Sequence, residues 1–150
     1  METCNSHSIS SLDHCSVIEL PRHRHPNGSL SVVENCGDTP FDIKRVFYLY
    51  DVPGDSERGG HSHHTARELI VAVSGSFDVV LDDGKQQRVY TLNRPYRALY
   101  IEAGIWRILN NFSSGSVCLV LTSELYEEAD YVRDYDTFLQ LTAHKTPQQP

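Results

Sequence analysis

The sequence predicts an all-β protein, built as a sandwich or barrel of short strands, and three observations support this fold class. Short apolar or alternating runs recur along most of the chain, turn-forming residues separate them every eight to twelve residues, and only the segment after residue 123 has helical character. With 150 residues, the chain is long enough to form one domain with a substantial core.

The first third of the chain contains a lead-in and the first expected strands. Residues 1–14 are rich in Ser, His and Asn, and we expect a flexible lead-in there. Residues 21–28 contain two prolines and an Asn-Gly pair, which predicts a solvent-exposed loop. Strands are expected at 15–20, at 30–34 and within 41–52.

The remaining strands follow closely on one another. We expect them at 69–73, 77–81, 87–92, 98–101, 106–109 and 117–122. Asp82-Asp83-Gly84 predicts a hairpin turn, because Asp-Gly accepts positive φ at low cost. Helical turns are expected near 127–131 and 136–142, within an aromatic tail that we interpret as a packing lid. The expected domain covers 15–142, and 143–150 is expected to be disordered.

Composition argues against two classes of partner. The net charge is −7 and no stripe of Lys and Arg is present, so the chain does not have the pattern of a nucleic-acid binder. No apolar run approaches the roughly 20 residues of a membrane span, and the first residues do not resemble a signal peptide. The four cysteines show no regular spacing, which favours reduced thiols and a cytoplasmic location.

The candidate site is the segment 58–64, in which three histidines and Arg58 occur within seven residues. Side chains at i and i+2 of a strand point to the same face, so His61 and His63 are expected to project together while His64 points the other way. Two imidazoles on one face of a strand predict either a metal site or an acid/base site.

The spacing around these histidines resembles the first motif of the cupins. His61 and His63 are followed after four residues by Glu68 and after six more by Gly75. In the second cupin motif the metal-binding histidine position is occupied by Arg107. A guanidinium offers no lone pair and repels a cation, so we expect no metal. A metal-dependent cupin enzyme using the remaining three ligands stays an alternative.

Further segments resemble the sugar-nucleotide 3,4-ketoisomerases, the WxcM-like or FdtA-like branch of the cupins. The likeness covers about residues 15–138. The matching segments are KRVFYLYDVP at 44–53, RGGHSH at 58–63, VSGSF at 73–77, LDDG at 81–84, GIW at 104–106 and SELY at 123–126. Two positions depart from the usual pattern: His64 stands where the family has Lys, and Glu68 where it often has Gln.

The resemblance implies a cupin jelly roll that forms homodimers and acts on dTDP-4-keto-6-deoxyglucose. The enzyme would move the keto group from C4 to C3 without a redox cofactor. Its product would feed the synthesis of amino deoxysugars for surface polysaccharides or glycosylated metabolites. Three alternatives remain open: a sugar-nucleotide 3,5-epimerase, the metal-dependent cupin enzyme, and a non-catalytic sugar-nucleotide-binding protein.

The residue types also suit proton transfer next to a ketone. A neutral imidazole exchanges protons near neutral pH, so His61 or His63 is expected to take the C3 proton and the other to move a second proton. Which histidine does which stays open. On the strand within 41–52, Tyr48 or Tyr50 is expected to act as a donor or proton relay.

The expected substrate-binding residues are mostly cationic. Arg58 or Arg107 would balance developing negative charge or hold the pyrophosphate, and Arg45 would contact phosphate. Trp106 is expected to stack on a base or sugar, with a place in the core as the alternative. Glu68 completes the set, with an ordinary strand residue paired to an arginine as its alternative.

Overall fold

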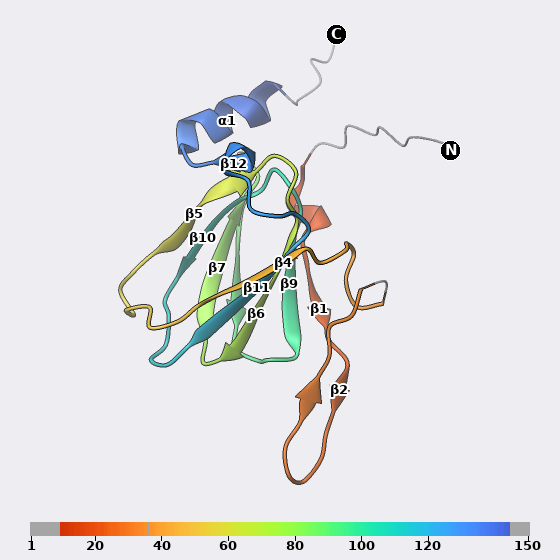
Figure 1. Cartoon of the computed structure of the whole chain (residues 1–150). Coiled ribbons are helices and arrows are strands. Elements are labelled where there is room, and N and C mark those ends of the chain that lie inside the picture. Colours follow the sequence, from red (N-terminus) through yellow and green to blue (C-terminus); the bar gives the residue numbers. More distant parts are fainter. Residues whose placement is uncertain (1–9, 36, 145–150) are drawn as a thin grey trace, which may run out of the picture.

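Two five-stranded antiparallel sheets face each other in the computed structural model, which describes residues 10–35 and 37–144 (Figure 1). The first sheet has the strand order β1 (Ser16–Glu19), β9 (Arg97–Ile101), β6 (Glu68–Ser74), β11 (Val117–Thr122), β4 (Arg45–Leu49). The second has the order β12 (Tyr131–Val132), β5 (Arg58–His63), β10 (Trp106–Asn110), β7 (Phe77–Asp82), β8 (Gln87–Leu92). Within the described residues the sheets stay separate, so the fold is a sandwich rather than a closed barrel.

The main core lies between the two sheets. Ile70 and Val120 from the first sheet pack with Phe77, Val79 and Leu81 from the second, as alternation along each strand requires. The β6 strand is buried on both faces, which explains its continuous apolar sequence.

The outer face of each sheet is covered in a different way. Phe41, from the segment before β4, packs with Leu69 and Tyr100 over the first sheet. The helix α1 (Tyr135–His144) lies beside β12 and β5 of the second sheet (Figure 1). Its Phe138 packs against Trp106. This cover directs half of the β10 side chains towards α1 and the other half into the sandwich.

Most predicted elements are present, and the N-terminal quarter needs two corrections. The predicted loop 21–28 contains β2 (Arg22–His23), which pairs with β3 (Leu30–Ser31) to form a projecting hairpin, so the strand expected at 30–34 is only two residues long (Figure 1). The packed part of the chain also begins before residue 15. Leu12, in the 3-10 helix η1 (Leu12–His14), is completely buried and belongs to the main core.

The C-terminal predictions agree with the structure more closely. The two expected helical turns correspond to the 3-10 helix η2 (Glu128–Asp130) and to α1. Residues 1–9 of the expected lead-in and 145–150 of the expected tail lie outside the described residues. No helix in the described ranges combines the length and apolar character that crossing a bilayer requires.

Gly75, which the sequence motif singled out, occupies the turn between β6 and β7. Its φ is +68°, and a Cβ at this position would lie 2.9 Å from the Cα of Ser116. Any other residue would be strained here both by its backbone conformation and by this contact. The motif glycine therefore serves the turn rather than the chemistry.

Of the four cysteines, Cys15 and Cys118 are buried free thiols, as the sequence predicts for them. Cys4 and Cys36 lie outside the described residues.

Candidate active site

Strand pairing brings the candidate residues together between the two sheets. His61 and His63 lie on the inward face of β5, and His61 is the cross-strand partner of Arg107 on β10. Glu68 reaches them from β6 in the opposite sheet. The expectation that the two imidazoles project together is therefore confirmed, with ring centroids 4.9 Å apart.

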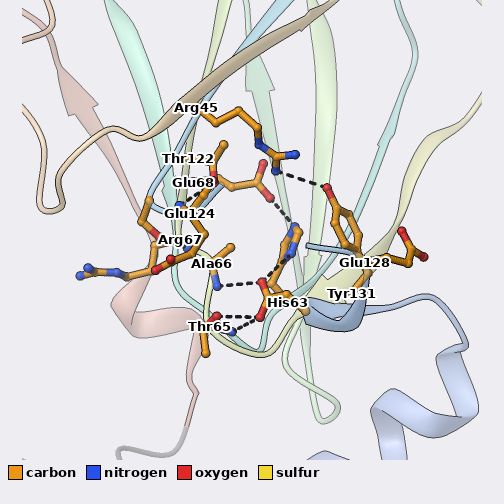
Figure 2. A network of polar contacts seen from close by, with 12 residues as sticks. Arg45, His63, Thr65, Ala66, Arg67, Glu68, Thr122, Glu124, Glu128 and Tyr131 are labelled. Carbon is orange, nitrogen blue, oxygen red and sulfur yellow. Dashed lines mark hydrogen bonds and ion pairs between the residues drawn. The ribbon is translucent and has the colours of Figure 1, made fainter. Parts of the chain in front are cut away.

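His63 is enclosed by two carboxyl groups. Its ring Nε2 lies 2.8 Å from Glu68 Oε1, and its Nδ1 lies 3.2 Å from Oδ2 of Asp130 in η2. Figure 2 shows the ring held between these contacts, and only 2% of the residue is exposed. Both ring nitrogens are therefore occupied by protein groups.

Arg107 is 1% exposed and supports the same network. It donates from Nη1 to Glu68 Oε1 and from Nη2 to the Ile105 carbonyl oxygen at 3.0 Å. Burial by itself would raise the pKa of Glu68, but the Arg107 guanidinium and the contact with His63 together hold that pKa below its usual range. Glu68 is therefore an ionised carboxylate inside the sandwich.

His61 differs from His63 because it borders open space. It lines a cavity of about 460 Å³. The other lining residues are Phe47, Leu49, Glu57, Arg58, Gly59, Gly60, Tyr131 and Arg133. Burial, followed by the positive charge of Arg107, lowers the pKa of His61 from 6.5 to about 3. The ring is therefore neutral at pH 7 and keeps a lone pair for a proton.

The residues here do not fit a metal ion. His61, His63 and Glu68 can each bring one ligand atom within 4.8 Å of the others. However, Glu68 Oε1 is already engaged by both His63 and Arg107. The guanidinium also places a permanent positive charge where a cation would bind.

Tyr131 is a site residue that the sequence did not reveal. Its ring centroid lies 5.0 Å from that of His61 and 4.4 Å from that of His63, and its hydroxyl accepts a hydrogen bond from Arg45 Nη2 at 3.4 Å (Figure 2). It reaches the site because β12 pairs with β5, opposite His63. The tail that we interpreted as a lid thus also contributes side chains to the site. No local pattern in the sequence signals this pairing.

The three arginine candidates occupy different positions around the site. Arg58 lines the cavity beside His61, Arg45 contacts Tyr131, and Arg107 lies buried behind His61. Among the described residues, neither Arg45 nor Arg58 forms an ion pair with a carboxylate. Arg133 is a further cation at the cavity, and it is paired with Glu128.

Two tyrosine candidates are not brought to the imidazoles. Tyr48 and Tyr50 lie on the outer side of the first sheet, 59% and 62% exposed, because alternation along β4 turns Arg45 and Phe47 inward instead. Both tyrosines line a second pocket of about 380 Å³, which shares Leu49, Glu57 and Arg58 with the cavity beside His61 but does not include either imidazole. We therefore leave them out of the proposed catalytic set.

Trp106 is likewise separated from the cavity. It precedes Arg107 on β10, so the two side chains point to opposite faces of the sheet. Trp106 is 6% exposed and packs against Phe138 of α1, with ring centroids 5.5 Å apart. Trp106 therefore has a place in the core, which was the alternative to stacking on a base or sugar, and we remove it from the substrate-contacting set.

This combination of a β-sandwich and a buried histidine–carboxylate network agrees with a family match over most of the chain. Residues 13–143 match the family described as FdtA, WxcM-like, C-terminal. The chain therefore belongs to the FdtA/WxcM-like family, and the resemblance seen in the sequence is confirmed.

Individual relatives narrow the comparison to one type of enzyme. A TDP-4-oxo-6-deoxy-α-D-glucose-3,4-oxoisomerase from Aneurinibacillus thermoaerophilus is 39% identical over 127 residues, which are 85% of this chain and 91% of that protein. The solved QdtA sugar 3,4-ketoisomerase from Thermoanaerobacterium thermosaccharolyticum, in complex with TDP, is 35% identical with a TM-score of 0.87. That match covers 90% of this chain and 98% of QdtA.

A third relative has the highest identity of these three. The WlaRB TDP-quinovose 3,4-ketoisomerase from Campylobacter jejuni is 42% identical with a TM-score of 0.80, over 84% of this chain and 97% of that one. The predicted cupin-like sandwich is thus confirmed by structures of enzymes that share more than a third of their residues with this chain.

Proposed function

We propose that this protein is a sugar-nucleotide 3,4-ketoisomerase that moves the keto group of TDP-4-keto-6-deoxyglucose from C4 to C3. Its relatives are 3,4-ketoisomerases of TDP-sugars. The structural observation that carries the proposal is the neutral imidazole of His61, which borders a cavity of about 460 Å³ in front of a buried charged network. The cavity volume lies within the usual range for small-molecule sites.

The reaction needs two proton movements and no change in overall oxidation state. The C3 proton leaves, the C4 oxygen gains a proton, and a C3–C4 enediol forms. The C3 hydroxyl then loses its proton to become the ketone, while C4 gains a proton. In sum, one proton passes from C3 to C4 and one from the C3 oxygen to the C4 oxygen. One carbon base and one relay between oxygens therefore suffice.

His61 is the proposed carbon base, because its ring borders the cavity and is neutral. It would accept the C3 proton and return a proton to C4. The environment that lowers its pKa to about 3 opposes a lone imidazolium, so the charged form is favoured only when an enediolate balances it. This coupling links proton uptake to formation of the intermediate.

Tyr131 is the proposed relay between the two oxygens. Its hydroxyl already accepts a hydrogen bond from Arg45, so its own O–H is free to point towards a ligand in the cavity. A phenol can donate to the C4 oxygen and then accept from the C3 hydroxyl. The positive charge of Arg45 would stabilise the negative charge that develops during this exchange.

Arg58 is the proposed contact for the pyrophosphate. It lines the cavity beside His61 and has no ion-pair partner among the described residues. A guanidinium matches phosphate oxygens in both charge and geometry. Arg133 is less available because Glu128 binds its Nε and Nη2.

The decisive experiment incubates the protein with TDP-4-keto-6-deoxyglucose in deuterated water and follows the sugar by NMR. We expect the C4 ketone signal to be replaced by a C3 ketone, with deuterium at C4 to the extent that His61 exchanges with solvent. Deuterium confined to C3 and C5 with an unmoved ketone would indicate a 3,5-epimerase instead. Tight binding without either change would indicate a non-catalytic binding protein.

A metal-dependent reaction is tested separately. Because Arg107 engages the only carboxylate of the candidate ligand set, we expect full activity after treatment with EDTA and dialysis. Loss of activity on chelation, restored by one divalent ion, would contradict this proposal.

We further propose a homodimer in the cytoplasm. The family resemblance implies the dimer, and Val46, Tyr48 and Tyr50 expose an apolar surface on β4, at the edge of its sheet, that a second copy would cover. Sedimentation analysis of the parent and of Tyr48→Glu tests this, with a dimer expected for the parent only. The acidic charge and the free thiols of Cys15 and Cys118 support the cytoplasm, which cell fractionation would test.

A further inference from the structure

Asp130 makes more hydrogen bonds than an ordinary surface carboxylate. Its Oδ1 accepts from the backbone N–H of Thr65 at 2.8 Å and from the Thr65 hydroxyl at 2.6 Å. Its Oδ2 accepts from the Ala66 N–H at 3.1 Å and contacts His63 Nδ1 at 3.2 Å. The carboxylate thus ties the turn after β5 to the buried imidazole.

The two carboxyl groups around His63 both favour the ionised form. Partial burial would raise the pKa of Asp130, but the hydrogen bonds from Thr65 and Ala66 outweigh it and lower that pKa. Glu68 is held ionised by Arg107, as described above. An ionised carboxylate can only accept hydrogen bonds. A hydrogen bond to each of these carboxylates therefore requires an N–H on each ring nitrogen of His63, one towards Glu68 and one towards Asp130.

This donor arrangement separates the tasks of the two histidines. A ring that donates from both nitrogens has no lone pair, and His63 is too enclosed to reach a ligand in the cavity. His61 has neither constraint: within the described residues, no side-chain hydrogen bond reaches its ring. The other charged or polar groups near the pair are Arg107 on β10, Arg45 on β4, Tyr131 on β12, and Glu57, Arg58 and Arg133 at the cavity.

We propose that Asp130 is a positioning residue, which holds His63 as a donor on both ring nitrogens and so leaves carbon proton transfer to His61 alone. This inference rests on the proposed ketoisomerase function. Figure 2 shows the hydrogen bonds that Thr65 and Ala66 contribute to this arrangement. With Asp130 in place, the His63 ring is fixed beside His61, with the two ring centroids 4.9 Å apart.

The first test needs no substitution at Asp130. Protein labelled with ¹⁵N-histidine is studied at pH 7 by long-range proton–nitrogen correlation, and the His63 signals are assigned by their absence from His63→Gln. We expect both His63 ring nitrogens to be protonated and His61 to have one bare nitrogen. A bare nitrogen on His63 in the folded parent would overturn the inference, whatever the enzyme's activity.

The second test uses Asp130→Asn, with Glu127→Gln as a matched control. The asparagine amide would donate to His63 Nδ1, so the ring would become neutral and keep its hydrogen on Nε2. We expect kcat to fall roughly 10- to 100-fold with KM within about threefold, the size of loss typical when an outer-shell hydrogen-bond partner of a site residue is removed. Glu127 is exposed and makes no side-chain capping bond, so its variant should match the parent.

Thr65→Val provides a milder variant if Asp130→Asn does not fold. It removes one hydrogen bond to Asp130 and keeps the carboxylate. We expect a smaller loss of kcat and an unchanged His63 spectrum. Full kcat in a folded Asp130→Asn with a neutral His63 would overturn the inference. An inactive parent with the expected His63 spectrum would instead contradict only the proposed function.

Discussion

The ring of His61 meets the ring of His63 edge-on, with the ring planes at 84° and the centroids 4.9 Å apart. The two residues are only two positions apart, yet one borders the cavity and the other is enclosed by carboxyl groups. The enclosed ring therefore lies directly against the ring that borders the cavity. The following expectations test this division.

His61→Asn should retain substrate binding and lose turnover. Removing a general base typically costs about 10²- to 10⁴-fold in rate, and we expect a loss in kcat of that size with KM little changed. Steady-state kinetics and calorimetric binding of TDP measure the two effects. His64→Asn is the matched control, because this exposed residue directly follows β5 and does not line the cavity. Equal kcat for His61→Asn and the parent would remove His61 from the mechanism.

Tyr131→Phe should reduce kcat by about 10²-fold or more, because the hydroxyl that relays the proton between the sugar oxygens is lost. The ring contacts with both histidines would remain. Tyr48→Phe and Tyr50→Phe should behave like the parent, because these hydroxyls lie on the outer side of the first sheet. The opposite ranking would favour the assignment made from the sequence.

Arg107→Met should destabilise the fold strongly, because it leaves the Glu68 carboxylate buried without its guanidinium. Breaking a buried ion pair from one side typically costs about 3–5 kcal/mol. The double variant Arg107→Met with Glu68→Gln should recover part of this loss, since no uncompensated charge remains. Urea unfolding of the parent, both single variants and the double variant measures the coupling. Purely additive losses would show that the pair is not coupled.

Stability should fall as the pH decreases from about 6.5 towards 3, and His61 should account for part of the fall. Its pKa is about 3 in the folded chain and ordinarily 6.5, so between these values the unfolded chain binds more protons. Stability therefore rises with pH across this window. Urea midpoints of the parent and His61→Gln at several pH values test this, and the difference between them should narrow as the pH falls. A constant difference would contradict the lowered pKa.

Glu68 and Asp130 add a loss of stability in the same direction at lower pH. Both pKa values are depressed in the folded chain, so their contribution is present above the ordinary carboxyl pKa and disappears as the pH falls through the folded value. Both the parent and His61→Gln contain these two carboxylates, so their contribution cancels in the difference between the two proteins. The comparison therefore isolates the contribution of His61.

The sequence by itself determined the class of fold and the family. Alternation and turn residues are local properties, so they located β4 and all of the strands from β6 to β11. The spacing of His61 and His63 likewise predicted that their side chains project together, because residues at i and i+2 share a face of a strand. The resemblance to the cupin motif, rather than strand periodicity, added Glu68 to them. The N-terminal hairpin was missed because its two-residue strands have no periodicity to detect.

Only the tertiary structure decided which of these residues meet the ligand. Asp130 lies 67 positions after His63, and its contact exists only because η2 and β12 fold back onto β5. The packing of α1 on one face of β10 turned Trp106 outward and Arg107 inward, a choice that alternation permits in either direction. Strand periodicity predicts which side chains share a face of a sheet. It does not predict which face is covered, and the elements that pack on each face determine which side chains enter the core and which line the site.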